Sequence, residues 1–290
     1  MLIADLIHTL RIKVYSIEHL TIGDWWSYKN VNSPFTRLYF TPRSSRTYIE
    51  HHGERFLLEP GTMVIAPPYT PVNYICEDFC EMYGVIFSAQ LGSEVDLFTL
   101  NDLNWSQRAE GFIPSLFERL VEINPDRQMK IADPFHKAYN ATITAQHDYQ
   151  QPFHESMETE AIIKLIISRF LESDANPKPC QNQLNQERVL QAIDYIESHM
   201  SENLTLDKLS SLANVHPTYF SNVFVDILNV RPSVYIQQKR IEKAQLLLVS
   251  TSKPVKQIAT EVGFKDPDYF FRAFKKVTGC TPRSYRISYA

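Results

Sequence analysis

The last third of the chain contains one pattern twice. The matched positions are 50 residues apart; they are Pro217 and Pro267, Tyr219 and Tyr269, Phe220 and Phe270, Phe224 and Phe274, Pro232 and Pro282, and Tyr235 and Tyr285. Further upstream, Leu209 matches Ile258 at a spacing of 49, as one extra residue in the turn of the second copy requires. Such a repeat indicates a duplicated structural unit.

Each copy has the pattern of two short helices joined by a tight turn. The first helices are predicted over residues 206–213 and 255–262, and a turn of three to four residues follows each. Apolar core positions then recur at helical spacing; they are Phe220, Val223, Phe224 and Ile227 in the first copy, and Phe270, Ala273, Phe274 and Val277 in the second. This pattern predicts two helix-turn-helix units joined by a long helix over residues 233–249. Plain helical hairpins are the alternative, whereas a solenoid is disfavoured because it needs about three copies.

Prolines and polar residues mark where these helices begin. Five prolines stand just before or within the first turn of an apolar-periodic stretch, where a missing N–H costs nothing; they are Pro217, Pro232, Pro254, Pro267 and Pro282. Asp266 and Thr281 are the matching N-caps, because their side-chain oxygens can accept from free backbone N–H groups. The beginnings of the helices are therefore predicted with their caps.

The charge of the chain is divided unevenly along its length. The whole chain has a formal net charge of −4, but residues 227–290 hold 12 basic and 4 acidic side chains. A basic segment on an acidic chain indicates a polyanionic partner, with a merely solvated basic surface as the alternative. Within the first copy, residues 187–226 hold 2 basic and 6 acidic side chains, so this motif is expected to bind weakly or to depend on the second.

The N-terminal part reads as β-structure followed by helices. Short β-rich runs are separated by Pro, Gly, Ser and Asn; they span residues 35–40, 46–50, 56–58, 62–66 and 81–87. No helix-length segment separates them, so an antiparallel sandwich or small barrel is expected. Helices are predicted around residues 113–120 and 162–170, and the latter carries an apolar stripe that can cover a sheet or pair with another subunit.

The polar, proline-bearing run at residues 173–179 predicts an interdomain linker. The expected organisation is an α+β multidomain chain. A β-domain with added helices occupies residues 1–175, a linker 176–184, and an all-α domain 185–290.

Several classes of protein and site are excluded or disfavoured. Neither a P-loop nor a G-x-G-x-x-G turn occurs, so no nucleotide cofactor is expected. No apolar run approaches the ~18–20 residues of a bilayer span, and the N-terminus lacks a signal-peptide pattern, so we expect no membrane association and a cytoplasmic location. The four cysteines, Cys76, Cys80, Cys180 and Cys280, are expected to be free thiols.

Residues 258–286 resemble the C-terminal signature of AraC/XylS-type transcription regulators. The matching residues include Ala259, Gly263, Phe264, Asp266, Tyr269, Phe270, Arg272, Phe274, Gly279, Thr281, Pro282 and Tyr285, and the first copy extends the resemblance over about 105 residues. Residues 53–68 are similar to the cupin-like, jelly-roll sensor domain found at the N-terminus of many members. The resemblance implies a sequence-specific regulator of promoter DNA. It also implies RNA polymerase and a second copy of the chain as partners.

Turning the core faces inward leaves a predicted DNA-reading surface. The base-reading candidates are Thr218, Ser221, Asn222 and Val225 on the first recognition helix and Asp268, Phe271, Arg272 and Lys275 on the second. Arg272 is the strongest, since a guanidinium can meet guanine O6 and N7 together. Candidates for phosphate binding are Lys276, Arg283 and Arg286, with the helix N-termini at Pro217 and Pro267.

The first copy departs from the family pattern at three positions. His216 replaces the frequent Ser cap, Asn222 replaces a basic residue, and Asn229 replaces the usual Gly. Asn can adopt the left-handed backbone conformation, so the turn at Asn229 is still expected to form.

The N-terminal domain offers candidates for a ligand pocket. Aromatic rings around an arginine suit a sugar or small organic acid; the candidates are Trp25, Trp26, Arg37, Tyr39, Tyr48 and Tyr83. These residues can equally form plain core, which leaves two readings: an activator that responds to a small molecule, and a regulator whose domain only dimerises. A metal-dependent cupin enzyme is a third, disfavoured reading. Its only candidate ligands are His51 and His52, and adjacent strand residues point to opposite faces.

Overall fold

The computed structural model describes most of the chain as two compact units. The described residues are 8–44, 46–91, 95–99, 103–128, 133–134, 151–171, 183–228 and 230–289. One unit contains the described parts of residues 12–88 and 102–173, and the other contains those of 174–287 together with 1–11 and 89–101. The linker predicted over residues 173–179, Cys180 and Asn229 lie outside the described residues. No helix among the described residues has the length and apolarity that crossing a membrane requires.

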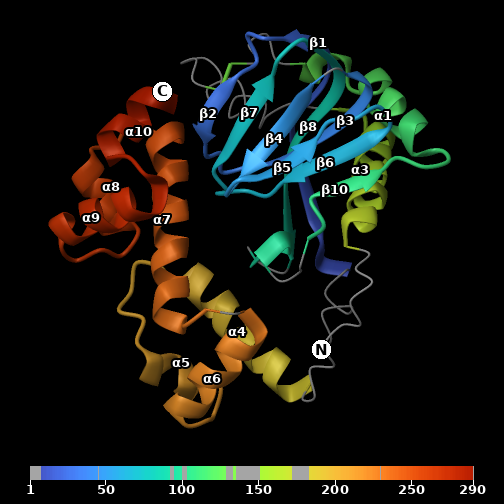
Figure 1. Ribbon diagram of the computed structural model, residues 1–290. Coiled ribbons are helices and arrows are strands. Elements are labelled where there is room, and N and C mark those ends of the chain that lie inside the picture. The colour runs from blue at the N-terminus through green and yellow to red at the C-terminus, as the bar shows by residue number, and fades with distance from the viewer. Residues whose placement is uncertain are drawn as a thin grey trace. The chain divides into compact units, whose positions relative to one another are not determined.

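Two sheets form the β-structure (Figure 1). The larger sheet has the order β1-β8-β3-β6-β10, with β9 beside β8, and the smaller has the order β2-β7-β4-β5. The strands are β1 (Arg11–Gly23), β2 (Tyr28–Val31), β3 (Thr36–Ser44), β4 (Thr47–His51), β5 (Glu54–Leu57), β6 (Thr62–Ala66), β7 (Val72–Cys76), β8 (Phe79–Leu91), β9 (Val95–Asp96) and β10 (Ser106–Arg108). The pairings β3–β6, β3–β8, β4–β5 and β4–β7 are antiparallel, as expected from the short connections.

The register of β3 decides which side chains enter the space between the sheets. Tyr39 pairs with Gly84 and Phe40 with Tyr83, and successive side chains point to opposite faces. Tyr39 belongs to a buried cluster that takes residues from both sheets, among them Val64 and Tyr74. Phe40 lies on the other face, where its ring is 4.9 Å from that of Phe117. The cluster between the sheets is therefore the core of this unit.

Two helices cover the outer face of the larger sheet beside β3 and β10 (Figure 1). They are α1 (Ile113–Glu122) and α3 (Phe153–Phe170). In α1, Ile113, Phe117 and Leu120 are buried at helical spacing. In α3, the apolar stripe from Ile162 to Phe170 is at most 7% exposed within a single chain. The expectation that this stripe is available for another subunit is therefore wrong, because the domain itself buries it.

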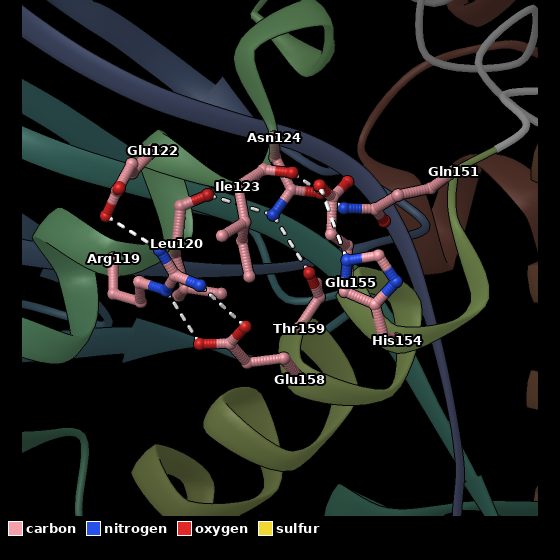
Figure 2. A network of polar contacts seen from close by, with 10 residues as sticks. All are labelled: Arg119, Leu120, Glu122, Ile123, Asn124, Gln151, His154, Glu155, Glu158 and Thr159. Atoms are coloured by element: carbon pink, nitrogen blue, oxygen red, sulfur yellow. Dashed lines mark hydrogen bonds and ion pairs between the residues drawn. The ribbon is translucent and has the colours of Figure 1, made fainter.

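Polar contacts fix α3 against α1. Figure 2 shows Arg119 between two carboxylates: its Nε and Nη2 donate to Glu158 at 2.7 and 2.9 Å, and its Nη1 lies 2.9 Å from Glu122. Nearby, Nδ2 of buried Asn124 donates to Leu120 O and Thr159 Oγ1, both at 2.9 Å. The hydrogen bonds from Arg119 lower the pKa of the Glu158 carboxyl group.

The C-terminal unit has the duplicated architecture predicted from the repeat. Its helices are α4 (Gln183–Ser198), α5 (Leu206–Leu212), α6 (Pro217–Leu228), α7 (Pro232–Ser250), α8 (Val255–Glu261), α9 (Pro267–Thr278) and α10 (Pro282–Tyr289). Helices α5 and α6 form the first copy, α8 and α9 the second, and α7 joins them. The cores repeat closely: the ring centroids of Phe224 and Tyr235, and those of Phe274 and Tyr285, are each 5.5 Å apart.

One core position of the second copy was predicted wrongly. Val277 is 40% exposed, and Thr278 is buried in its place at 3%. Thr278 Oγ1 donates to Phe274 O at 2.9 Å, so its hydroxyl group is satisfied inside the helix. Apolar character alone gives the wrong residue here, because a threonine that satisfies its own hydroxyl group can be buried at low cost.

Candidate DNA-binding surface

Helices α6 and α9 present most of the predicted base-reading residues to solvent. Among these residues, Thr218, Asn222, Asp268, Arg272 and Lys275 are exposed, and Val225 and Phe271 are half-buried. The exception is Ser221, which is only 9% exposed. The opposite faces are closed by Phe220 and Phe224 in α6 and by Phe270 and Phe274 in α9. Each helix thus has one face available to a partner.

The N-termini of both helices are capped by side chains. Asp266 Oδ1 accepts from Asp268 N at 2.9 Å, which confirms the predicted cap of α9. At the start of α6, His216 Nδ1 lies 3.3 Å from Thr218 N and takes the place of the usual Ser. The departure from the family pattern at His216 therefore keeps a cap. Each first turn still has further backbone N–H groups that can meet an anion.

Basic side chains surround the exposed face of α9. Arg272, Lys275 and Lys276 are exposed, as is Arg283 in the first turn of α10. Among the described residues, no carboxylate lies within ion-pair distance of any of these four. Their charges are therefore available to a polyanion.

Arg286 has a different environment from these four. Its Nε donates to Leu248 O at 3.2 Å and its Nη2 to Lys253 O at 2.6 Å. These contacts satisfy carbonyl groups at the end of α7 and in the following loop, which is a structural role. The assignment of Arg286 to phosphate is corrected on this ground, because its guanidinium is already bound to the protein.

The sequence interpretation missed Arg231, the residue before α7. Its Nη1 donates to Ser221 Oγ at 3.0 Å and to Asn222 Oδ1 at 3.2 Å, and its side chain is exposed. These contacts bring a guanidinium group to two of the predicted base-reading residues. The 50-residue spacing pairs Arg231 with the cap residue Thr281, so the alignment of the two copies contains the signal.

Three of the six candidates for the ligand pocket meet between the sheets. Trp26, Arg37 and Tyr39 are buried there with Tyr74 of β7. Arg37 Nη1 donates to Tyr74 Oη at 2.6 Å, and Tyr39 Oη donates to the same oxygen at 3.1 Å. Burial raises the pKa of Tyr74, although Arg37 and Tyr39 oppose this, so the phenol is neutral at physiological pH. The alternation of Val72, Tyr74 and Cys76 in β7 could have revealed Tyr74 as a member.

The other three candidates are placed elsewhere. Trp25 is 53% exposed. Tyr48 precedes the core residue Ile49 in β4, and its ring faces Arg55, whose Cζ is 4.5 Å from the ring centroid. Tyr83 stacks on His19 at 4.2 Å on the outer face of the larger sheet. Their assignment to the pocket is therefore wrong, because strand alternation directs the two tyrosines away from the space between the sheets.

The histidine pair departs from the expected geometry without forming a metal site. His52 has a φ of 49° in the turn after β4, and the rings of His51 and His52 are 4.1 Å apart. They do not point to opposite faces, because His52 is no longer in the strand. Among the described residues, no group of three or more His, Cys, Asp or Glu side chains is arranged to hold a metal ion. Cys76, Cys80 and Cys280 are free thiols, and burial raises the pKa of Cys80 to about 11.

A family profile described as a helix-turn-helix domain matches residues 209–288. This range begins within α5, ends within α10, and includes most of the first copy and all of the second. Residues 209–288 form an AraC-type helix-turn-helix domain. The rest of the chain lies outside that match.

Two relatives are similar to part of this chain. An uncharacterized HTH-type transcriptional regulator of Staphylococcus aureus is 30% identical over 146 residues, which are 50% of this chain and 20% of the relative. The uncharacterized HTH-type transcriptional regulator YobQ of Bacillus subtilis is 36% identical over 95 residues, which are 33% of this chain and 39% of the relative. The chain therefore matches well under half the length of these two relatives.

Among solved structures, the C-terminal domain of AraT, a response regulator from Geobacillus stearothermophilus, is 38% identical. The match covers 34% of this chain and 83% of that one, with a TM-score of 0.34.

Proposed function

We propose that this chain is a transcription regulator that binds double-stranded promoter DNA sequence-specifically. One observation carries the proposal: α6 and α9 occupy equivalent places in two copies of a helix-turn-helix unit, and each presents an exposed polar face. A recognition helix of this kind fits the major groove, where polar side chains can distinguish base pairs. The net positive charge of residues 227–290 supplies phosphate contacts.

The test is DNA binding by the full chain at several salt concentrations. Binding-site selection from random duplexes identifies a preferred sequence, and fluorescence anisotropy then compares it with a shuffled duplex. We expect tighter binding to the selected duplex and a linear fall of log K with log salt, because phosphate neutralisation releases counterions. Equal affinity for both duplexes, or an affinity independent of salt, would contradict the proposal.

We also propose that the N-terminal domain binds a small sugar or organic acid and that this ligand makes the chain an activator. Arg37, Tyr39, Tyr74 and Trp26 support this part of the proposal. They place a guanidinium group, two phenol groups and an indole ring together inside the domain. Such a set can orient a carboxylate or hydroxyl groups while aromatic faces pack against carbon. Contact of the activator with RNA polymerase rests on the family resemblance.

Thermal-shift screening of the full chain against sugars and organic acids tests the effector. A ligand of the native state must raise the midpoint of the transition to which the N-terminal domain contributes. Tyr39→Phe should reduce that shift while leaving a folded domain. Tyr48→Phe is the matched control outside the cluster and should leave the shift intact. If no compound raises the midpoint, the result favours the alternative that the domain dimerises without a ligand.

We infer that the chain acts as a homodimer through the exposed side of α3 rather than through its buried isoleucines. Phe153, Met157 and Leu165 are 80%, 58% and 36% exposed, and they are separated by multiples of four residues along α3. Sedimentation of the full chain and of Met157→Lys tests this. A dimer that becomes monomeric in the variant supports the surface, and a dimer that persists in the variant refutes it.

A further inference from the structure

Each copy of the helix-turn-helix unit has an arginine near its recognition helix, but at a different position in the repeat. At the spacing of 50 residues, Asn222 of α6 corresponds to Arg272 of α9, and Arg231 before α7 corresponds to Thr281 before α10. The second copy therefore has its arginine on the recognition helix and a small hydroxyl residue at the next helix cap. The first copy has an amide residue on the recognition helix and the arginine at the cap.

The two cap positions behave differently. Thr281 Oγ1 accepts a hydrogen bond from Ser284 N at 3.1 Å and caps α10. Arg231 occupies the N-cap position of α7, but its side chain makes no capping hydrogen bond. It reaches α6 instead, where its Nη1 donates to Ser221 Oγ at 3.0 Å and to Asn222 Oδ1 at 3.2 Å. The first copy therefore gives up a capping side chain and places a guanidinium group on its recognition helix.

That guanidinium group lies beside Asn222, the residue that corresponds to Arg272 in the other copy. Asn222 is uncharged, whereas the corresponding residue of α9, Arg272, carries a positive charge. Arg231 places a positive charge next to Asn222 through the hydrogen bond from its Nη1. Helix α6 itself contains no basic residue, and its one charged side chain is Asp226. Arg231 is thus the basic group that the structure places on this recognition face.

The remaining hydrogen-bond donors of Arg231 are available. The protein contacts of its side chain among the described residues use Nη1, which leaves Nε and Nη2 without a partner there. None of the described carboxylates lies within ion-pair distance of it. Two adjacent N–H donors in a planar group match O6 and N7 of guanine. The bond from Nη1 also fixes Asn222 with its oxygen toward Arg231 and leaves the amide NH2 to donate to a neighbouring base.

We propose that Arg231 is a specificity-determining residue that reads a guanine in the half of the DNA site bound by α6. The inference rests on the proposed function and deepens it, because it assigns the first copy a base contact that α6 alone does not provide. A base contact is favoured over a phosphate contact because Arg231 is bound to Ser221 and Asn222, in the middle of the recognition helix rather than at its N-terminus.

Binding-site selection with the full chain tests the assignment, using Arg231→Thr and Arg231→Lys beside the wild type. Arg231→Thr introduces the residue of the second copy and supplies a cap, so its unfolding midpoint should equal or exceed that of the wild type. Arg231→Lys keeps the charge but loses the planar fork. In Arg231→Thr, the preference for one guanine should fall from about tenfold or more to near onefold, with the other positions unchanged. Arg231→Lys should keep only part of that preference, because an ammonium group can still donate to O6 or N7.

Two further variants serve as controls. Arg272→Ala should change the preference at a different position, in the half of the site bound by α9. Lys253→Ala removes one charge from the same unit at a residue that pairs with Glu261 at 2.8 Å, and it should leave every base preference intact.

Two results would overturn the assignment. One is an Arg231→Thr variant that binds as the wild type does. Another is a variant that binds all sequences more weakly with unchanged preferences, which makes Arg231 a phosphate contact. A wild type that selects no sequence would instead refute the proposed function, so the two failures are distinguishable.

Discussion

Arg240 Nε donates a hydrogen bond to the carbonyl oxygen of Met200 over 3.0 Å. Its Nη2 also donates to Glu202 O at 2.6 Å, so the side chain ties α7 to the segment after α4. Gly263, in the turn between α8 and α9, lies against the same place. Its φ is +94°, and a Cβ atom there would collide with Met200 O and lie 2.8 Å from Arg240 Nε. The absence of a side chain at Gly263 lets the second copy approach this junction.

Gly263→Ala should therefore destabilise the C-terminal unit. The substitution adds left-handed strain and forces a backbone carbonyl to move, which together cost about 3 kcal/mol. Urea denaturation followed by far-UV circular dichroism measures the loss in the free energy of unfolding. Gly53→Ala is the matched control, with a φ of +84° and no atom within 4 Å of the added Cβ, and it should cost only about 1 kcal/mol. Equal losses would show that the close approach at Gly263 has no energetic weight.

Lys239→Met should destabilise the same unit through its carboxylate partners. Lys239 is 7% exposed, and its Nζ lies 2.9 Å from Glu242 and 3.8 Å from Glu197. Burial works to lower the pKa of Lys239, but the neighbouring acidic groups outweigh it and raise the pKa. Removing the ammonium leaves poorly solvated carboxylates, at a cost of about 3 kcal/mol in the free energy of unfolding.

Lys208→Met is the control for that variant. Lys208 pairs with Glu202 at 2.6 Å, but both side chains are more than 40% exposed, so water screens the pair. Its unfolding curve should overlay that of the wild type. If both variants lose the same stability, burial of Lys239 is not the cause.

Arg272→Ala and Lys276→Ala should have different effects on DNA binding. Both side chains are exposed, but Arg272 lies on the predicted base-reading face of α9 and Lys276 is assigned to phosphate. Arg272→Ala should relax the preference at one base pair, at a cost of ~1–3 kcal/mol. Lys276→Ala should weaken binding to all sequences about equally and reduce the salt slope by roughly one unit. Site selection that shows every preference unchanged in Arg272→Ala would mean that the recognition face is placed wrongly.

The contacts between α1 and α3 should make the stability of the N-terminal domain depend on acidic pH. The pKa of Glu158 is lowered in the folded state, chiefly by the hydrogen bonds from Arg119. Its contribution is therefore present above the unfolded pKa and is lost as pH falls through the lower folded value. The stability difference between the wild type and Arg119→Met should thus shrink as pH falls below about 4.5. Lys164→Met, which breaks the exposed pair with Glu160, serves as the control and should show a smaller change with pH.

The duplication allowed much of the C-terminal unit to be predicted from the sequence. Helix starts at Pro217, Pro232, Pro267 and Pro282 are confirmed, because proline and a capping residue act locally. The strand over residues 62–66 was also predicted with its bounds. β1 over Arg11–Gly23 was missed, since its burial comes from distant strands rather than from a clear alternation of its own.

The site was predicted less completely, because side-chain partners depend on tertiary contacts. Alternation shows that Tyr39 and Tyr83 lie on strands, but only their pairing with Gly84 and Phe40 shows that they occupy opposite faces. Similarly, the sequence marks Arg286 and Arg231 as basic without showing what each reaches. The first finds backbone carbonyl groups and the second finds α6.

The length of helix α7 fixes the distance and the relative orientation of the two copies that it joins. It spans 19 residues, or about 28 Å, and its two ends pack into the two cores through Tyr235 near the start and Gln245, which bonds to Tyr285 at 3.1 Å, near the end. One inserted residue would rotate everything after it by about 100° around the helix axis and displace it by about 1.5 Å. The second recognition helix would then face a different direction from the first. In the proposed function, the length of this helix therefore sets the spacing and the relative orientation of the two half-sites on DNA.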